Sequence, residues 1–320
     1  MSRDAERAGV PLTNLDQPLF DGAEATKRDL VDYLDAARDR ILPELQGRPL
    51  SVIRVLRAQQ PFMQKNLPKY APPWLPRVTL WAESSQREVA YALCEDRRSL
   101  LWFANQRAVE YHPTLVRADR WDRSTHLVLD IDPPAGSPFA TAVAAARLVA
   151  QALAELGMAA AVKTSGAKGL HVVVPVTDTP VADVAAATRA LAARAERLDP
   201  RLATTAFIRE DRGGRVFLDA TRVGGATLVA AYSPRVRPGT PLSYPVAWED
   251  LDRVTPADFT VRNAAAMVAE SDPWADLMPA PRPVAPVLVE EGREIPVARV
   301  QAMHEGKRRA RARRTAGEDA

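Results

Sequence analysis

The spacing of apolar residues predicts four helices along the chain. In the stretch TKRDLVDYLDAARDRILPEL, apolar residues recur every three or four positions and so share one face of a helix. The stretch RRSLLWFANQRAVEYH shows the same spacing, and two Ala-rich stretches extend it over more turns. The predicted helices span residues 26–45, 97–112, 139–156 and 180–198, the last with Thr179 as its cap and Pro180 in its first turn.

Shorter apolar runs, several of them alternating with polar residues, predict the strands. They cover residues 48–56, 88–96 and 126–132, two strands around a loop within 159–176, and a β-hairpin over 213–234. Gly224 and Gly225 lie near the turn of that hairpin. Between the first two strands, residues 59–76 are polar and rich in proline, which excludes long regular structure.

The periodicity fades after Trp274. The stretch MPAPRPVAPVLVEEG is rich in proline, which indicates a linker or a wrapped extension. We therefore expect one compact unit over residues 1–277, followed by a Pro-rich extension and a basic, mobile tail over 278–320. The tail contains KRRARARR, and its cations would either add a salt-dependent attraction to DNA or have no role.

Composition narrows the class of protein. The chain has 320 residues, of which 47% are hydrophobic and 26% charged, as in a soluble globular protein. Neither a membrane-spanning run nor a signal peptide is apparent, and the single cysteine, Cys94, excludes an internal disulfide framework and a cysteine-built zinc site. We expect a cytoplasmic location. With a net charge of only +3, any nucleic-acid footprint has to be local.

Three aspartates are the first candidate for chemistry. In HLVLDIDPP, Asp130 and Asp132 lie two residues apart on a predicted strand and so face the same way. Their carboxylates repel each other unless a cation neutralises them. Asp219, in RVFLDA, follows a similar run, and three such carboxylates would suit two Mg²⁺ or Mn²⁺ ions that activate an attacking oxygen. Alternatively, each aspartate only ends a strand or begins a turn.

The loop TSGAKGLH offers groups for an anion. Gly166 and Gly169 let the backbone bend so that amides can point at a phosphate, while Ser165 and Lys168 add donors. The spacing is not that of a Walker loop, and a simple hairpin is the alternative. His112, expected at the end of a helix, and two arginines in YSPRVRPG could complete the site, unless they are a structural histidine and a solvated turn.

The order of these motifs resembles the polymerase domain of bacterial ligase D, in the archaeo-eukaryotic primase superfamily. The resemblance covers residues 14–277 and extends to TKRDLVDYL, GRPLSVIRV, NLPKYAPPWL, ANQRAVEYH and VAWEDL. It implies an α/β primase-polymerase core in which a β-sheet with flanking helices carries the acidic metal triad. It also implies template-directed nucleotidyl transfer, in which a primer 3′-OH attacks the α-phosphate of an NTP or dNTP.

The resemblance also implies roles for individual residues. Asp130, Asp132 and Asp219 would hold two Mn²⁺ or Mg²⁺ ions, and ribonucleotides would be inserted at least as readily as deoxyribonucleotides. The implied nucleotide-binding residues are His112, Ser165, Gly166, Lys168, Gly169, His171, Arg235 and Arg237. The implied DNA-binding residues are Lys27, Phe62, Lys65 and Arg212. Alternatively, Lys27, Phe62 and Arg212 are ordinary surface residues.

Two positions depart from the family pattern. Gln17 stands where a lysine usually accompanies Lys27 at the downstream 5′-phosphate, so we expect weaker or different recognition of that phosphate. Met63 replaces the second of two adjacent aromatic residues, which would loosen the grip on the template.

The chain lacks the Lys-x-Asp-Gly motif of an ATP-dependent ligase, so we expect a stand-alone polymerase. Its expected partners are DNA, Ku and a separate ligase, in end joining first and gap filling second. One alternative is a non-catalytic DNA-end-binding scaffold. Another is a haloacid-dehalogenase-type phosphohydrolase, which Pro134 disfavours because that family has Thr or Val there.

Overall fold

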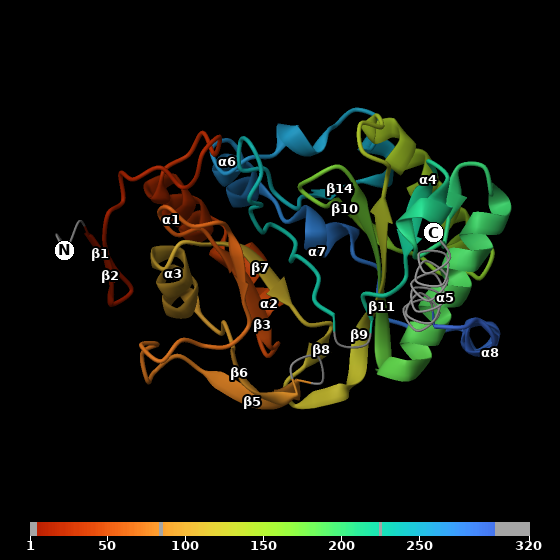
Figure 1. Ribbon diagram of the computed structural model, residues 1–320, viewed down its shortest axis with the longest axis horizontal. Coiled ribbons are helices and arrows are strands. Elements are labelled where there is room, and N and C mark those ends of the chain that lie inside the picture. The colour runs from red at the N-terminus through yellow and green to blue at the C-terminus, as the bar shows by residue number, and fades with distance from the viewer. Residues whose placement is uncertain (1–4, 83–85, 224–225, 298–320) are drawn as a thin grey trace, which may run out of the picture.

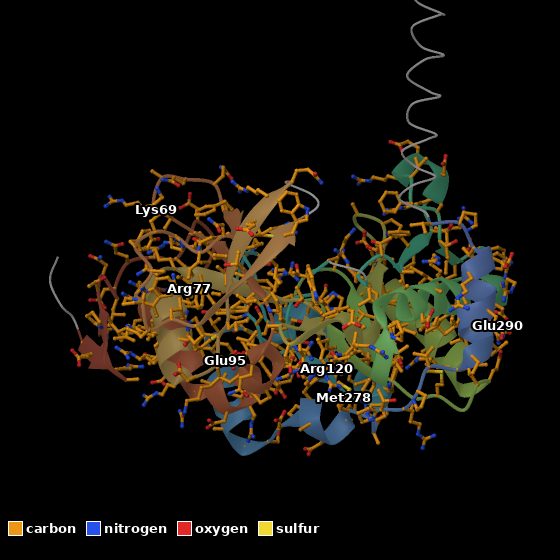
Figure 2. All side chains as sticks on the ribbon, turned by 90° about the horizontal axis from the view of Figure 1, so that it is seen from below. Lys69, Arg77, Glu95, Arg120, Met278 and Glu290 are labelled. Atoms are coloured by element: carbon orange, nitrogen blue, oxygen red, sulfur yellow. The ribbon has the colours of Figure 1, made fainter. Side chains whose placement is uncertain are left out.

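A computed structural model describes residues 5–82, 86–223 and 226–297 of the chain. The molecule has two parts that lie side by side, each a β-sheet with helices packed on it (Figure 1). The N-terminal elements lie at one end of the molecule, and the two long helices over residues 139–154 and 181–198 lie at the other. Side chains fill both parts, with Lys69 and Arg77 on the first and Glu290 on the far side of the second (Figure 2). Within the described residues, no helix is both long and apolar enough to cross a membrane.

The first part is built around a five-stranded sheet with the order β4-β3-β6-β5 and with β7 also paired to β3. Its strands are β3 (Leu50–Arg54), β4 (Phe62–Gln64), β5 (Arg77–Ala82), β6 (Arg87–Ala92) and β7 (Ala108–Pro113). The hairpin β1 (Ala5–Arg7) and β2 (Val10–Leu12) and the helices α1 (Lys27–Ala36), α2 (Arg38–Leu45) and α3 (Arg97–Asn105) complete it. Thr26 caps α1 through a reciprocal pair of bonds with Asp29, which fixes the predicted start of that helix.

The second part contains a seven-stranded sheet with the order β12-β13-β9-β11-β10-β14 and with β8 beside β9. Its strands are β8 (Val116–Arg117), β9 (Arg120–Asp132), β10 (Ala161–Thr164), β11 (Leu170–Pro180), β12 (Ala203–Thr204), β13 (Val216–Asp219) and β14 (Pro245–Val246). The helices α4 (Phe139–Ala154) and α5 (Val181–Leu198) pack against each other and cover one face of this sheet (Figure 1). Ile131 of β9 is fully buried, and the alternation of the strand turns Asp130 and Asp132 to the opposite face.

The remaining elements are short. They are the helices α6 (Ala264–Glu270), α7 (Pro273–Leu277) and α8 (Pro286–Glu294) and the 3-10 turns η1 (Arg209–Arg212), η2 (Trp248–Asp250) and η3 (Pro256–Asp258). The low periodicity of the Pro-rich extension does not predict α8, which packs on α5 so closely that Gly292 leaves no room for a side chain against Ala186. Arg194 also donates two hydrogen bonds to Glu291, at 2.9 and 2.5 Å. The basic run in residues 307–314 lies outside the described residues.

Two predicted helices have different bounds in the structure. The helix expected over residues 26–45 is divided at Ala37 into α1 and α2. The helix expected over residues 97–112 ends at Asn105, because Arg107 takes a left-handed conformation with φ of 60°. The residues that follow form β7 and pair with β3, so the prediction that His112 lies at the end of a helix was wrong.

Two further expectations were also wrong. Thr179 does not cap α5, because it belongs to β11 and its hydroxyl donates to the carbonyl of Thr177. Within the described residues of 213–234 the expected hairpin is not formed, because both edges of β13 are occupied, one by β12 and the other by β9. Gly224 and Gly225, expected near its turn, lie outside the described residues. The segment expected to return along β13 instead follows β7, where the amides of Leu228 and Ala230 donate to its carbonyls. The strands β4 and β5 were not predicted.

Candidate active site

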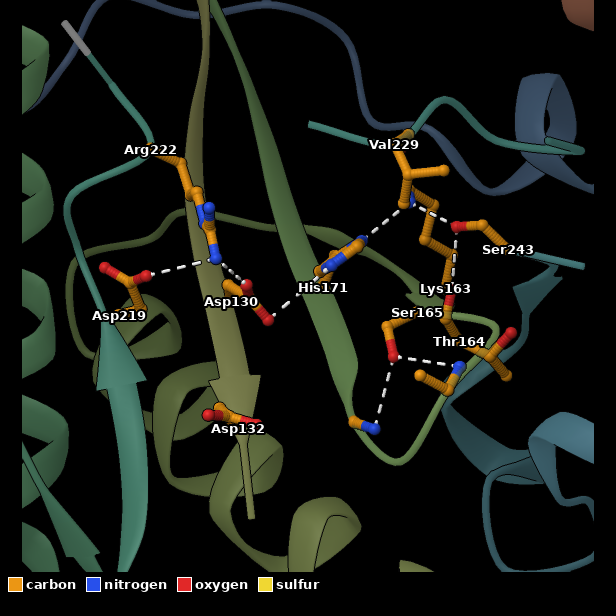
Figure 3. Close-up of polar contacts among 12 residues, drawn as sticks. Asp130, Asp132, Lys163, Thr164, Ser165, His171, Asp219, Arg222, Val229 and Ser243 are labelled. Carbon is orange, nitrogen blue, oxygen red and sulfur yellow. Dashed lines mark hydrogen bonds and ion pairs between the residues drawn. The ribbon is translucent and has the colours of Figure 1, made fainter. Parts of the chain in front are cut away.

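The acidic residues lie where β9 and β13 run antiparallel. Asp219 is directly opposite Asp130 in the register of these strands, and Asp132 is opposite Phe217. The guanidinium of Arg222 bridges the first two, with its Nη2 at 2.7 Å from Asp130 Oδ2 and 3.3 Å from Asp219 Oδ2 (Figure 3). Arg222 was not predicted from the sequence, although it lies only three residues after Asp219.

The charges of this cluster oppose one another. Burial raises the pKa of Asp130, Arg222 counteracts that rise, and the neighbouring carboxylates of Asp219 and Asp132 add to it. The net result is a pKa above the ordinary value for Asp130. Because the raised pKa means that the charged form of Asp130 is disfavoured, any additional positive charge nearby would stabilise its carboxylate.

Asp132 lies apart from the other two carboxylates and has its own cations. Lys168 Nζ is 2.9 Å from its Oδ1, and Arg212 Nη1 is 3.6 Å from its Oδ2. Lys168 also donates to the carbonyl of Pro133. These residues, with Arg209 and Arg215, line a cavity of about 310 Å³ whose charged lining is four cations and the Asp132 carboxylate, and we call it the cationic cavity.

The carboxylate oxygens of the three aspartates suit a hard divalent cation, but they are not arranged around a single point. Among the described residues, no group of three His, Cys, Asp or Glu side chains is close enough together to hold a metal ion. Asp130 and Asp219 nevertheless both direct a carboxylate oxygen at the guanidinium of Arg222. Carboxylate oxygens are the ligands that Mg²⁺ and Mn²⁺ prefer. A metal shared by all three aspartates therefore requires the side chains of Arg222 and Lys168 to move.

A second cluster surrounds a buried carboxylate, Glu110. His112 Nε2 lies 2.8 Å from Glu110 Oε2, Arg235 Nε lies 3.0 Å from the same oxygen, and the amide of Val236 donates to Oε1 at 2.8 Å. Burial alone would raise the pKa of Glu110, but the bond from His112 and the charge of Arg235 lower it to about 2. Glu110 and His112 share a face because β7 is a strand, so reading this stretch as a helix concealed the pair.

Arg235 connects this cluster to the loop between β10 and β11. Its Nη1 donates to the carbonyl of Ser165, and the side chain passes so close to Gly166 that a Cβ there would lie 2.5 Å from Arg235 Cγ. Gly166 also has φ of 65°, which favours glycine. At Gly169 a Cβ would lie 2.0 Å from the carbonyl oxygen of Ile131. Both glycines therefore permit close packing against the protein's own backbone and side chains.

The loop amides are partly engaged within the loop itself. Ser165 Oγ accepts hydrogen bonds from the amides of Ala167 and Gly169, at 3.3 and 3.2 Å (Figure 3). His171, at the start of β11, is buried with its Nε2 at 3.6 Å from Asp130 Oδ1. Arg237, by contrast, is exposed on its turn.

The predicted DNA-binding residues occupy different environments. Lys27 is only 2% exposed, and its ammonium donates to the carbonyl of Thr13 and to Asn105 Oδ1, both at 2.6 Å. Phe62 is 36% exposed on β4, and Lys65 is exposed just beyond it. Arg212 stacks on Phe217 with its guanidinium carbon 3.8 Å from the ring centroid. The DNA contacts of these residues stay predictions.

Comparison with known proteins defines the class. The family model described as "LigD, primase-polymerase domain" matches residues 26–274, and this chain belongs to that family. The α/β primase-polymerase fold and the nucleotidyltransferase class expected from the sequence are thereby confirmed.

Individual relatives show how far the similarity extends. The multifunctional non-homologous end joining DNA repair protein LigD of Mycobacterium tuberculosis is 32% identical over 294 residues, which is 88% of this chain and 38% of the relative. The bifunctional LigD of Bacillus subtilis is 30% identical over 259 residues, 79% of this chain and 41% of the relative. A solved structure, the polymerase domain from Mycobacterium tuberculosis ligase D in complex with DNA, matches with a TM-score of 0.75 and 31% identity, covering 83% of this chain and 96% of that one. The chain thus spans well under half the length of these two LigD proteins.

Proposed function

We propose that this protein adds nucleotides to the 3′ ends of DNA primers in a template-directed reaction. The observation that carries the proposal is the register of β9 and β13, which sets Asp219 opposite Asp130 so that both carboxylates pair with the guanidinium of Arg222. The structural similarity to a polymerase domain in complex with DNA supports the same activity.

The three aspartates are the proposed metal ligands. Asp130, Asp132 and Asp219 would hold two Mn²⁺ or Mg²⁺ ions, which when bound lower the pKa of the attacking hydroxyl and neutralise charge on the phosphate. The face of β9 that carries Asp130 and Asp132 supplies the oxygen donors. Arg222 neutralises Asp130 and Asp219, and Lys168 neutralises Asp132.

The proposed triphosphate site lies beside them. Arg235 is held between Glu110 and the Ser165 carbonyl, so it links the strand that carries His112 to the glycine loop. Ser165, Lys168 and His171 follow along that loop, and Lys168 lines the cationic cavity next to Asp132. Gly166 and Gly169 allow the close packing of the loop, and Arg237, like Lys168, is exposed.

For DNA we propose contacts by Phe62, Lys65, Arg212 and Lys27. Lys27 is buried, so its ammonium would have to leave Thr13 and Asn105 to reach a phosphate. The similarity to LigD proteins named for non-homologous end joining supports a role in that pathway. Within it we propose Ku and a separate ligase as partners and chromosomal DNA in the cytoplasm as the place of action. Gap filling in excision repair is the second pathway, and insertion of NTPs alongside dNTPs is part of the proposal.

The test is extension of a labelled primer across a short gap, with Mn²⁺ and each NTP or dNTP, with and without a downstream 5′-phosphate. The matched variants are Asp130→Asn and Asp252→Asn, since Asp252 is an exposed aspartate paired with Arg147. We expect templated addition by the wild type and by Asp252→Asn but not by Asp130→Asn. A folded wild type that binds DNA without extending any primer would overturn the proposal in favour of a scaffold.

A further inference from the structure

A fully buried lysine lies behind the acidic site. Lys163 of β10 is 1% exposed, and its ammonium has three partners (Figure 3). These are His171 Nδ1 at 2.7 Å, the carbonyl of Val229 at 2.9 Å and Ser243 Oγ at 2.5 Å. Lys163 is not among the proposed metal, nucleotide or DNA ligands, and a charged side chain this deeply buried requires a reason.

The direction of each of these hydrogen bonds can be deduced. A lysine ammonium has three protons and no acceptor, and a backbone carbonyl can only accept. The hydroxyl of Ser243 donates its own proton to the carbonyl of Thr164 at 2.8 Å, so its oxygen accepts from Lys163. The third proton therefore goes to His171 Nδ1. A neutral imidazole that accepts at Nδ1 carries its single proton on Nε2.

That proton faces the acidic residues. His171 is opposite Asp130 in the register of β11 and β9, and its Nε2 lies 3.6 Å from Asp130 Oδ1. The ring is 3% exposed, which shields the arrangement from water. Burial and the charge of Lys163 both lower the pKa of His171, which is consistent with a neutral ring.

We propose that Lys163 is a positioning residue: its ammonium holds Nδ1 of His171 as an acceptor and thereby aims the Nε2–H at Asp130 and the incoming phosphate. The kinetic part of this inference rests on the proposed polymerase function. Lys163 touches neither the aspartates nor the cationic cavity, so it acts through the orientation and tautomer of His171. The arrangement is typical of sites in which a second group fixes which histidine nitrogen carries the proton.

The first test reads the tautomer directly. The chain has four histidines, so nitrogen-15 NMR of histidine-labelled wild-type protein gives a spectrum that His171→Gln assigns by loss of one ring. Burial lowers the pKa of Lys163 to about 7, so the spectrum is taken at about pH 6, where the ammonium form dominates. We expect His171 to be unprotonated at Nδ1 and protonated at Nε2. A proton on Nδ1 would overturn the proposal, whatever the protein's activity.

The second test is a double-mutant cycle in primer extension with Lys163→Met, His171→Gln and both together. We expect Lys163→Met to lower kcat/KM for the nucleotide about tenfold, the size of one hydrogen bond to a charged group. In the His171→Gln background it should have no further effect, because its route of action is gone. Equal losses in both backgrounds would mean that Lys163 acts by another route.

The control separates stability from positioning. Thr188→Val removes a buried hydroxyl from α5, where it donates to the carbonyl of Val184, and should leave kcat/KM unchanged. If Lys163→Met does not fold, the wild-type tautomer still decides the proposal. A wild type that extends no primer refutes the polymerase function but leaves the NMR result to stand alone.

Discussion

Arg222 offers the sharpest perturbation of the acidic site, because it is the cation that Asp130 and Asp219 share. The substitution Arg222→Gln would leave two opposed carboxylates about 5 Å apart, the usual spacing of directly paired residues. At an effective dielectric constant of 20, they would repel each other by roughly 3 kcal/mol. Arg222 is 36% exposed, so solvent screens part of this energy. We expect the variant to lose about 1–2 kcal/mol of stability in the presence of a chelator.

The same reasoning predicts the opposite effect on metal affinity. In the wild type a divalent ion has to displace the guanidinium from both carboxylates, whereas in Arg222→Gln it meets no competing cation. A competition worth about 1.4 kcal/mol would tighten Mn²⁺ binding about tenfold in the variant. The two predictions can be measured together by following thermal unfolding across a Mn²⁺ titration, in which the variant should gain more in Tm than the wild type.

Arg209→Gln is the matched control, because Arg209 lines the neighbouring cavity and its loss changes the local charge equally. We expect its Mn²⁺ dependence to resemble that of the wild type. If Arg222→Gln binds Mn²⁺ more weakly than the wild type does, the guanidinium is not a competitor for the metal site. The reasoning from the shared cation would then be refuted.

Three further predictions follow from the buried groups. Asp130→Asn should reduce the rate of templated addition by at least about 10³-fold, as primer-extension kinetics would measure. It should change the free energy of unfolding, measured by thermal unfolding, by less than about 1 kcal/mol, because it also removes a charge that the neighbouring carboxylates repel. Glu110 has its pKa lowered from 4.5 to about 2, so it should contribute about 3 kcal/mol of stability that is present above pH 4.5 and lost as the pH falls toward 2. Comparison with Glu110→Gln in urea across that range measures this contribution, and parallel pH curves would contradict it. Gly169→Ala should lower the free energy of unfolding by at least about 3 kcal/mol or prevent folding, because its Cβ would meet the Ile131 carbonyl. Gly157→Ala, with open space around it, should lower the same free energy by only about 1 kcal/mol in the same urea assay.

Local patterns predicted the elements whose determinants are local. The capping residues of α1 and the long apolar stripes of α4 and α5 are visible within a few turns of sequence. The strand β7 was missed because its composition also suits a helix and its partner β3 lies more than fifty residues earlier. The expected hairpin failed for a similar reason: β9, far away in the sequence, occupies the edge of β13 that the return strand would have needed.

The same division applies to the candidate site. The spacing of Asp130 and Asp132 identified a carboxylate pair, because alternation along a strand is a local property. Arg222 and Glu110 could not be found in this way. Arg222 reaches Asp130 across 92 residues, and Glu110 joins Arg235 only once β7 is recognised as a strand. Sequence patterns therefore indicated the acidic ligands, while the cations and carboxylates that balance them depend on tertiary structure.

The pairing of these charges indicates how metal and nucleotide binding would be linked. Arg222 pairs with Asp130 and Asp219, Lys168 pairs with Asp132, and Arg235 pairs with Glu110. Divalent ions at the three aspartates would take over the carboxylates that Arg222 and Lys168 now neutralise. Those two cations would then be available to the phosphates of a nucleotide, whose own charge in turn favours the metal ions. Because each ligand would release partners that the other needs, we expect metal and nucleotide to strengthen each other's binding reciprocally.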